Sequence, residues 1–572
     1  MSPRSNKTES YTHLLRSAVR LRLTSLSQFS LTMQLIPTGI HGCKDLHTHR
    51  LVSSTSQTRE SETCFNPSKA SGPDEIPCKL LQAVADEIAP AIAAFFRQSL
   101  ATGKLPDPWR TAWISPVYKK GPRCEAENYR PVSLTCVMCK LMEHIICTHM
   151  RGHFDNHGIL TNLNHGFRKN HSCESQLMIT THDFLLRLDK KHQVDTLILD
   201  FSKAFDTVPH KRLLQKLELY GVGGELLDWI SVFLTERTQS VMIDGVRSRS
   251  DTVMSGVPQG TVLGPLLFLV HINDLPSVVD PNTAVRLFAD DCLLYRSVFS
   301  TEDHTQLQRD LDALVLWGNC WGMRFNAKKC HVLHLSRTLV PPVRFYHISG
   351  VVLGVKRSAT YLGVLIADNL DWKEHTTDLA HKAHQRLGFA RRNLRGCPLK
   401  YRELAYTSIV RPLMEYCDTI WDPTVKDHSD KLEWVQRKAA RWAKNKPYRR
   451  NDGRYDEVSV TGLLRDLNWM ELRDRRRKHR ETLFYKILNN LIAIDRTIVD
   501  YSDKIELKLN TRLQRKKNSH SKQLKVLSAS DSHSPLWRST AIRTVRDWNN
   551  LPAPVAEAAE LTEFKEQLWA KP

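Results

Sequence analysis

Three aspartates occupy positions where carboxylates could hold a metal ion. Asp200 ends an apolar run that starts at Val194 and has the β-branched bias of a buried strand. Further along, Asp290 and Asp291 separate two apolar runs, which predicts a hairpin with two carboxylates at its tip. Adjacent carboxylates repel each other unless one is protonated or a cation lies between them. A solvated strand end or acidic turn is the simpler interpretation of each feature taken alone.

Between these aspartates lies a run rich in glycine and proline, Ser255-Gly-Val-Pro-Gln-Gly-Thr-Val-Leu-Gly-Pro-Leu-Leu-Phe268. These residue types describe a backbone that turns tightly, lets a ligand approach closely and then enters a helix. Gln259 would then contact a nucleotide or a template base. A plain junction between a loop and a helix is the alternative.

The charge balance favours a polyanionic partner. The chain of 572 residues is too long for one hydrophobic core, so three or more lobes are expected. It carries 82 Lys and Arg against 61 Asp and Glu, a net charge of +21. Residues 431–530 alone hold 26 basic and 12 acidic residues, a difference of +14. Basic side chains release counterions from phosphates, which favours nucleic acid as the partner over a generically basic protein.

Thirteen cysteines are scattered without the regular spacing of a disulfide framework. The sequence shows no signal peptide and no long apolar span, so we expect a reduced intracellular chain of the nucleus or cytoplasm, without a membrane partner. Cys136, Cys139, His144 and Cys147 have a spacing that could bind zinc. The same residues fit an amphipathic helix, and packing within that helix is the preferred interpretation.

The order of elements is predicted to be mixed α/β, followed by basic helices. Predicted strands are Trp113–Tyr118, Val194–Asp200, Lys329–Leu335 and Thr360–Ile366. Predicted helices are Leu80–Leu100, with Pro90 at the start of a second helix, then His375–Leu394, Tyr401–Tyr416, Ser429–Lys444 and Leu472–Leu488. Residues 510–535 are expected to form a linker, with a short element near Trp548.

The motifs, in this order and spacing, resemble the palm of a reverse transcriptase. They are Asp200-x4-Phe205, Ser255-Gly-Val-Pro-Gln-Gly260 and Phe288-Ala-Asp-Asp291. Three further segments resemble the fingers of LINE-type enzymes: Lys69-Ala-Ser-Gly-Pro-Asp74, Asn128-Tyr-Arg-Pro-Val-Ser-Leu134 and His165-Gly-Phe-Arg-Lys169. Others resemble the closing palm motifs and the thumb of Jockey- and CR1-like elements: Phe325-Asn-Ala-Lys-Lys-Cys330, Tyr361-Leu-Gly-Val364, Arg411-Pro-Leu-Met-Glu-Tyr416 and Leu432-Glu-Trp-Val-Gln-Arg-Lys-Ala-Ala440. The sequence is thus similar to the reverse transcriptases of non-LTR retrotransposons from about Asn66 to near its C-terminus.

This resemblance implies an α/β (α+β) right-hand polymerase: fingers and a palm with an antiparallel sheet, followed by an all-helical thumb. The implied domains are a poorly ordered leader or truncated upstream remnant at 1–65, mainly fingers at 66–199, the palm at 200–370, the helical thumb at 371–500, and a basic linker with a C-terminal element at 501–572. Such proteins usually also carry an endonuclease, which the first sixty-five residues are too few to form, so we do not expect this chain to nick duplex DNA.

The resemblance further implies an RNA-directed DNA polymerase that copies an RNA template from a DNA primer with dNTP substrates. Asp200, Asp290 and Asp291 would hold two Mg²⁺ ions, with Mn²⁺ as a substitute, since Mg²⁺ prefers hard oxygen ligands. Lys329 matches a palm lysine that assists the departure of pyrophosphate. Nothing in the sequence indicates the oligomeric state.

Matching positions imply two further groups of site residues. The nucleotide-binding residues are Lys119, Arg130, Phe201, Phe205, Gln259 and Gly260. Within this group, Arg130 and Lys119 would hold the triphosphate, and Phe205 would exclude a 2′-hydroxyl. Tyr361, Leu362 and Gly363 would support the primer end. For each of these residues, an ordinary surface lysine or core aromatic is the alternative.

Two other functions fit parts of the sequence. A domesticated RNA-binding scaffold would have no reason to retain three carboxylates that repel each other. A group II intron maturase would carry a DNA-binding or nuclease appendage after the thumb, and no such pattern is present in the sequence. A polymerase is therefore the preferred prediction.

Overall fold

The computed structural model describes residues 70–338, 341–445, 459–498, 520–522, 524 and 539–570. The predicted leader at 1–65, Lys69 and most of the predicted linker at 510–535 lie outside this part of the chain. The chain divides into two compact units. Unit 1 comprises Met1–Leu160 and Phe205–His271, and unit 2 comprises Thr161–Ala204 and Ile272–Pro572. The units therefore interleave in sequence and do not divide at the predicted border between fingers and palm, residues 199 and 200.

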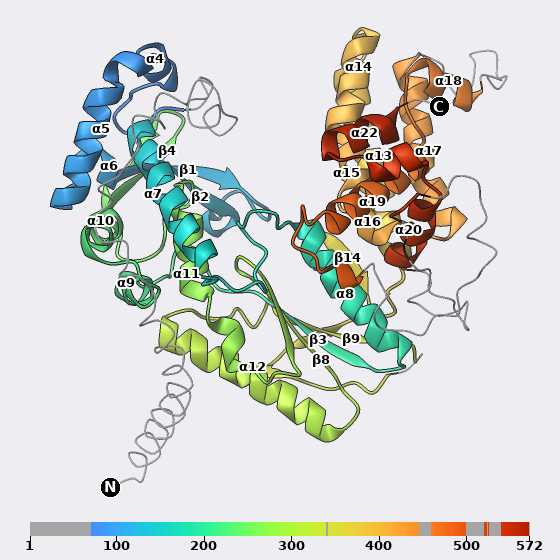
Figure 1. Cartoon of the computed structure of the whole chain (residues 1–572), viewed down its shortest axis with the longest axis horizontal. Coiled ribbons are helices and arrows are strands. Elements are labelled where there is room, and N and C mark those ends of the chain that lie inside the picture. The colour runs from blue at the N-terminus through green and yellow to red at the C-terminus, as the bar shows by residue number, and fades with distance from the viewer. Residues whose placement is uncertain are drawn as a thin grey trace. The chain divides into compact units, whose positions relative to one another are not determined.

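Unit 1 is built on a sheet of short strands covered by helices (Figure 1). The strand order is β2-β1-β4-β5, with β6 also paired to β4. The strands are β1 (Thr111–Tyr118), β2 (Tyr129–Leu134), β4 (Thr238–Ile243), β5 (Val246–Arg247) and β6 (Asp251–Thr252). The helices are α4 (Cys78–Ala83), α5 (Ala85–Thr102), α6 (Asp107–Arg110), α7 (Val137–Asn156), α9 (His210–Leu219), α10 (Gly224–Thr235) and α11 (Leu263–Ile272).

The placement of Pro90 at a helix start was wrong. Pro90 lies inside α5, which begins at Ala85, while the helix break falls at Val84 between α4 and α5. A proline beyond the first turn removes one backbone hydrogen bond of the helix. The apolar face of α5, with Ile92 and Phe96 buried, holds the helix against the unit in spite of this cost.

Unit 2 contains a five-stranded sheet with the strand order β12-β9-β3-β8-β7. Its strands are β3 (Val194–Leu199), β7 (Ala284–Phe288), β8 (Asp291–Ser297), β9 (His331–Leu335) and β12 (Gly354–Lys356). The four strands from β9 to β7 pair antiparallel as predicted, whereas β12 pairs parallel to β9. Helix α8 (Cys173–Asp189) lies on one side of this sheet and α12 (Thr301–Trp321) on the other (Figure 1). Because β3 is central, the residues before Asp200 belong to this sheet and to unit 2.

Two predicted strands of unit 2 differ from the structure. The segment Thr360–Ile366 is a hairpin, β13 (Ser358–Tyr361) and β14 (Val364–Ala367), because Leu362 and Gly363 have φ of +46° and +80°. Two consecutive residues with positive φ form a type I′ turn, which a continuous strand excludes. The strand predicted from Lys329 begins only at His331, so Lys329 lies in the preceding turn. A second small hairpin joins β10 (His347–Ile348) to β11 (Val351–Val352).

From Lys373 onward every described element is a helix. The longer ones are α13 (Lys373–Asn393), α17 (Lys426–Ala443), α19 (Leu472–Leu488) and α20 (Thr540–Asn549). The shorter ones are α14 (Leu399–Ala405), α15 (Arg411–Glu415), α16 (Asp418–Trp421), α18 (Val460–Asp466), α21 (Ala553–Glu557) and α22 (Leu561–Trp569). The helix predicted at Tyr401–Tyr416 is confirmed as a continuous helical run from α14 to α15, with a π-helical segment at Tyr406–Val410 between them.

One hydrophobic core joins these helices to the sheet of unit 2. It includes Val194 and Leu333 from the sheet and Trp421 and Trp548 from the helices. Around Asp422 the helices are also joined by charge, because its carboxylate contacts Arg476, Arg480 and Arg543 at 2.7–3.0 Å. No helix in the described part of the chain has both the length and the apolar character needed to span a bilayer.

Candidate active site

The pairing of strands β3 and β8 brings two of the predicted carboxylates to one edge of the sheet. Leu199 lies opposite Cys292 in an antiparallel register, so Asp200 and Asp291 each stand one position beyond that pair. Asp290 belongs to the two-residue turn that links β7 to β8, in which Phe288 pairs with Asp291. The hairpin predicted around these aspartates is therefore confirmed, and backbone pairing alone fixes where they lie.

A turn from another part of unit 2 holds Asp200 in place. The backbone N–H of Asn326 donates to the carbonyl of Asp200 at 2.7 Å. The backbone N–H of Asp200 donates to the buried Cys330 thiol at 3.4 Å, and burial raises the pKa of this thiol to about 11. The same turn presents Lys329, whose Nζ lies 3.6 Å from Asp200 Oδ2. Lys329 and Asp200 are thus neighbours, as their predicted roles in one site require.

The turn that carries Asp290 is supported from behind by the segment around Asn164. The Asn164 side chain accepts hydrogen bonds from the backbone N–H of Ala289 at 3.1 Å and of Gly166 at 3.0 Å. A Cβ on Gly166 would lie 2.4 Å from the backbone nitrogen of Ala289, so only glycine fits there. The motif His165–Lys169, which resembles a fingers segment, therefore lies in unit 2 against the carboxylate hairpin.

His165 lies in the segment that supports the Asp290 turn, and it is a buried neutral base. Its Nδ1 lies 2.7 Å from the Ser175 hydroxyl. Burial, together with the positive charges of His171, Arg286 and Arg168, lowers the pKa of His165 to about 3. The imidazole is therefore uncharged near neutral pH and adds no positive charge behind the aspartates.

The carboxylate edge fits a cation in its donor chemistry. Asp200 Oδ2 is a buried carboxylate oxygen that accepts no hydrogen bond and has the Lys329 ammonium group 3.6 Å away, so this point favours positive charge. All three predicted ligands offer the hard oxygens that Mg²⁺ prefers. Within the described ranges, however, no group of three or more His, Cys, Asp or Glu side chains is gathered closely enough to hold a metal ion.

Two predicted nucleotide-binding residues lie on one exposed hairpin of unit 1. Val117 pairs with Arg130, and the backbone N–H of Lys119 donates to the carbonyl of Asn128 at 2.8 Å. Since side chains alternate along a strand, Lys119 and Arg130 point to the same face. Both residues are exposed. This placement suits side chains that contact phosphate.

The glycine-rich loop of unit 1 is held by two close backbone approaches. Gly256 and Gly260 have φ of +93° and +103°, and a Cβ on either would lie under 3 Å from neighbouring backbone. Gly260 meets the carbonyl of Ser133, and Ser133 in turn donates to the carbonyl of Gln259 at 2.7 Å. The loop preceding helix α11 is confirmed, and its glycines are required by contact as well as by conformation.

The side chain of Gln259 donates to Asp206 Oδ1 at 3.0 Å. Phe205, one residue earlier, stacks on Phe268 of α11 with ring centroids 4.3 Å apart, and remains half-buried. Phe201 differs, because it is only 4% exposed and stacks on Phe325 within unit 2. A direct contact of Phe201 with a nucleotide would require its ring to move away from Phe325. Without that movement, we expect Phe201 to support neighbouring site residues rather than to touch the nucleotide.

The predicted primer-supporting residues form the turn between β13 and β14. Tyr361 is buried, and its hydroxyl accepts a hydrogen bond from Gln176 at 3.2 Å. The Tyr416 hydroxyl donates to the carbonyl of Leu362 at 3.0 Å, and a Cβ on Gly363 would lie 2.9 Å from the Tyr416 ring. Local sequence patterns did not indicate that Tyr416 supports this turn, because the contact joins residues more than fifty positions apart.

The cysteines with zinc-like spacing lie on or beside helix α7. Cys136 and Cys139 are buried, and the Cys139 thiol donates to Glu143 at 3.6 Å. Burial raises the pKa of Cys139 well above its ordinary value, which keeps it protonated. Glu143 accepts hydrogen bonds from the backbone N–H groups of Val262 and Leu263 and so caps α11. The amphipathic helix predicted there is confirmed, and it supports the helix behind the glycine-rich loop.

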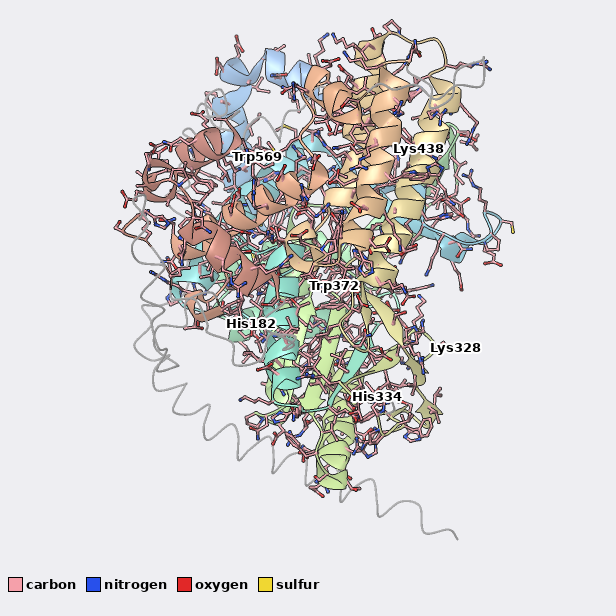
Figure 2. All side chains as sticks on the ribbon, turned by 90° about the vertical axis from the view of Figure 1, so that its right-hand side faces the viewer. His182, Lys328, His334, Trp372, Lys438 and Trp569 are labelled. Carbon is pink, nitrogen blue, oxygen red and sulfur yellow. The ribbon has the colours of Figure 1, made fainter. Side chains whose placement is uncertain are left out.

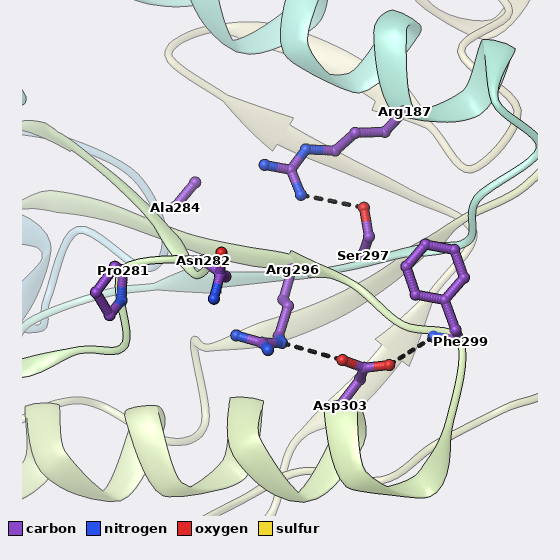
Figure 3. Close-up of a pocket in the computed structure, with 8 residues that line it drawn as sticks. All are labelled: Arg187, Pro281, Asn282, Ala284, Arg296, Ser297, Phe299 and Asp303. Carbon is purple, nitrogen blue, oxygen red and sulfur yellow. Dashed lines mark hydrogen bonds and ion pairs between the residues drawn. The ribbon is translucent and has the colours of Figure 1, made fainter.

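A pocket of about 470 Å³ opens at the far ends of β7 and β8 (Figure 3). No predicted site residue lines it. Its two arginines are already engaged: Arg187 donates to Ser297 at 3.1 Å, and Arg296 donates to Asp280 at 2.9 Å and contacts Asp303 at 3.5 Å. These contacts leave the pocket without a free charge for a reaction.

The comparison with known protein families gives one match that includes the candidate site. Residues 117–366 match the model of the family described as reverse transcriptase (RNA-dependent DNA polymerase). The matched residues include the motifs Asp200-x4-Phe205, Ser255–Gly260 and Phe288–Asp291, so the match agrees with the reaction class that these motifs predict.

The curated relatives that this chain resembles include RNA-directed DNA polymerases of transposons and mobile elements. The chain is similar to the probable RNA-directed DNA polymerase from transposon BS of Drosophila melanogaster, with 29% identity over 72% of this chain and 46% of that protein. The polymerase of the mobile element jockey, from the same fly, is 28% identical to this chain over 66% of this chain and 42% of its own length. The probable polymerase of the X-element, also from this fly, is 28% identical over 73% of this chain and 47% of its own length. The chain thus spans about half the length of the curated relatives it matches.

Among solved structures, apo telomerase from Candida tropicalis matches 71% of this chain and 71% of that one, with 9% identity and a TM-score of 0.37.

Proposed function

We propose that the whole chain acts as the RNA-directed DNA polymerase of a non-LTR retrotransposon. It would extend the 3′-hydroxyl of a DNA primer with dNTPs on an RNA template, in the nucleus or cytoplasm. The observation that carries this proposal is the edge of the unit 2 sheet where the β3–β8 register aligns Asp200 with Asp291 and the β7–β8 turn adds Asp290. This edge lies inside the matched reverse transcriptase domain.

Asp200, Asp290 and Asp291 would hold two Mg²⁺ ions, with Mn²⁺ as a substitute. When bound, such ions favour loss of the primer hydroxyl proton and stabilise the charge of the departing pyrophosphate. The chain's own contribution is to hold the carboxylates rigidly, through the strand register, the Asn326 turn and the Gly166 contact. A rigid arrangement of charge needs no reorganisation during the reaction.

Lys329 would act from its place beside Asp200. Its ammonium group is a compact charge with three donors, and its side chain is more than half exposed. It can therefore leave Asp200 and meet the pyrophosphate as negative charge develops there. Lys329 is a catalytic residue in this proposal because it would contact the leaving group.

The remaining predicted residues would bind the substrates. On unit 1, Arg130 and Lys119 would contact the triphosphate, Phe205 would limit access of a 2′-hydroxyl, and the loop at Gln259 and Gly260 would approach the nucleotide. Phe201, buried within unit 2 against Phe325, would also be a nucleotide-binding residue. On unit 2, the turn of Tyr361, Leu362 and Gly363 would support the primer end. The helices from Lys373 onward would form the all-helical thumb, with their basic surface along the template–primer.

The test is primer extension on an RNA template with purified full-length protein and Mg²⁺. Asp290→Asn keeps the side-chain volume and removes the charge, so incorporation should fall by at least about a thousandfold with little change in stability. Asp312→Asn, on the outer surface of α12, is the matched control and should extend primers at the wild-type rate. If Asp290→Asn extends primers at a rate near wild type, the assignment of the metal ligands is wrong.

A further inference from the structure

A second pocket lies among the helices of unit 2, away from the carboxylate edge. It has a volume of about 480 Å³ and opens between α13 and α17. His381 and His384 line it from α13, and Asp430, Lys431 and Trp434 line it from α17. Figure 2 marks the position of Lys438, one helical turn beyond Trp434. The volume is within the range of pockets that hold a small organic group such as a nucleotide.

The wall of this pocket is an exposed tryptophan surrounded by cations. Trp434 is 48% exposed, which is unusual for so large an apolar side chain. Lys438 Nζ lies 3.6 Å from the centre of its ring, and the His384 ring lies 5.1 Å away. Lys431 adds a second ammonium group at the pocket. An aromatic surface beside cations is the combination that binds a base and its phosphate in single-stranded nucleic acid.

Polar groups in the pocket favour the edge of a base over a phosphate group. His384 lines the pocket, and its Nδ1 is buried without a hydrogen-bond partner, so a base edge would contact this atom after a turn of the ring toward the pocket. Burial and the charges of Lys438 and Arg391 lower the pKa of His384, which keeps this imidazole neutral. Asp427 is neutralised by Lys431 at 3.2 Å, while Asp430 offers a further carboxylate. Carboxylates repel phosphate but accept hydrogen bonds from the amino groups of bases.

We propose that the α13–α17 pocket binds one unpaired nucleotide of a single strand. Its base packs against the exposed part of Trp434, Asp430 and His384 contact the edge of the base, and Lys431 and Lys438 lie near the phosphates. A base held in a duplex cannot enter the pocket, so the site distinguishes single strands from duplexes. The inference assumes nucleic-acid binding, as does the proposed function, but it involves none of the catalytic residues.

The test measures the binding of short fluorescent oligonucleotides to the full-length protein by anisotropy. RNA and DNA homopolymers, a duplex of the same length and free nucleoside monophosphates as competitors are compared. Trp434→Ala should weaken single-strand binding about five- to a hundredfold, because a base loses its stacking surface. Duplex binding should stay within about twofold. The slope of log affinity against log salt should also stay unchanged, since stacking releases no counterions.

Three further variants keep the test decisive. Trp434→Phe retains a ring and should recover most of the affinity, which also guards against a folding defect in the alanine variant. Phe389→Ala removes another exposed aromatic of α13 that does not line the pocket, and should bind like wild type. Asp430→Asn should change the ranking among homopolymers, since it alters the group that contacts the amino-bearing edge of a base.

Each result has one meaning. Equal single-strand affinity for Trp434→Ala and wild type overturns the proposal, as does a loss that is the same for single strands and duplexes. A loss accompanied by a smaller salt slope shows that the variant loses phosphate contacts of Lys431 and Lys438, and it overturns the role of Trp434 as a stacking surface. Competition by free nucleoside monophosphates at the oligonucleotide's own concentration shows that the pocket serves a free nucleotide. Primer extension is measured separately, so failure of the pocket and failure of the polymerase assignment are distinguished.

Discussion

Two hairpin turns in unit 2 carry predicted site residues, and both contain a residue with positive φ, but they differ in where glycine is placed. The carboxylate turn, Ala289–Asp290, joins β7 to β8, and the glycine turn, Leu362–Gly363, joins β13 to β14. In the glycine turn both residues have positive φ, and glycine occupies the second position. In the carboxylate turn Ala289 has φ of +54° without any glycine in the turn. Such a conformation costs about 1–2 kcal/mol for a residue with a Cβ.

The difference lies in where the glycine is placed. Gly363 relieves its own turn and gives room to the Tyr416 ring. At the carboxylate turn, Gly166 of a separate segment gives room to the backbone of Ala289. The second arrangement leaves the tip free to carry an aspartate and packs it closely from behind. Each turn holds one residue with a Cβ at positive φ, Ala289 or Leu362. Because the Ala289 turn packs closely against backbone and the Leu362 turn packs against a side chain, we infer that the carboxylate turn is the more rigid of the two.

The largest effect in this comparison is expected from Gly166→Ala. The new Cβ would lie 2.4 Å from the Ala289 nitrogen, so the loop or the hairpin must move. Overpacking of this kind costs about 1–3 kcal/mol of folding free energy. A displacement of about 1 Å at the catalytic end lowers the rate of incorporation about a hundredfold. Urea unfolding and primer extension measure the two effects.

Two controls define the cause of that loss. Gly152→Ala adds a methyl group in α7 where nothing lies within 4 Å, and should leave the activity unchanged. The double variant Gly166→Ala with Ala289→Gly removes the side chain of Ala289 but keeps its backbone nitrogen, so it should not recover. Recovery would mean that the contact is between side chains and that the turn is less rigid than we infer.

Patterns within short stretches of sequence predicted the strands, hairpins and helices that form within one segment of the chain. The apolar run before Asp200 and the hairpin at Asp290 agree with the structure because periodicity and flanking residues determine them. The helix at Leu472–Leu488 also has the predicted bounds, although several of its charged side chains are buried. The turn at Leu362 and Gly363 was missed because a single glycine within a β-branched run resembles an interrupted strand. The π-helical segment at Tyr406–Val410 was not predicted, because apolar spacing does not distinguish it from an α-helix.

The remainder depends on contacts between distant residues. No local pattern shows that Asn164 and Gly166 support the Asp290 turn, or that the segment before Asp200 and the segment after it belong to different compact units. The contact between Gly363 and Tyr416 is of the same kind. The resemblance to reverse transcriptases supplied the residues of the site, and only the structure shows which of them are neighbours.

A smaller effect is expected from Gly363→Ala. At φ of +80° a Cβ costs about 1–2 kcal/mol, and the new methyl group would also press on the Tyr416 ring at 2.9 Å. Since a side chain can move more easily than a backbone, incorporation should fall only about tenfold, less than for Gly166→Ala. Measurement of KM for the primer–template shows whether the loss lies in primer binding.

A matched turn isolates the two causes. Ser349 and Gly350 form the turn of the β10–β11 hairpin with φ of +51° and +82°, and nothing lies within 4 Å of a Cβ at Gly350. Gly350→Ala therefore carries the conformational cost without the contact. If Gly350→Ala lowers stability as much as Gly363→Ala does, the Tyr416 contact contributes nothing.

The smallest effect concerns acid, because each hairpin rests on a buried neutral histidine. Behind the carboxylate turn, burial and neighbouring positive charges lower the pKa of His165 to about 3. Beside the glycine hairpin, burial lowers the pKa of His375 to about 4, and its Nδ1 accepts a hydrogen bond from the Leu365 N–H at 3.2 Å. Both folded pKa values lie below the ordinary value of about 6.5. In acid, therefore, the unfolded chain binds protons at these two histidines, whereas the folded chain leaves them unprotonated.

The stability that depends on these two histidines is complete above about pH 6.5 and is lost as the pH falls from there toward the folded pKa values of about 3 and about 4. At about pH 6 each histidine should have lost about 1 kcal/mol relative to about pH 7.5. Urea unfolding at both pH values measures the loss. His165→Asn and His375→Asn each retain a polar atom near Nδ1 but cannot be protonated, so each variant should lose less stability than wild type over this interval. An identical loss in wild type and His165→Asn would mean that His165 already carries its proton in the folded protein, and the carboxylate turn would then rest on a cation rather than on a neutral base.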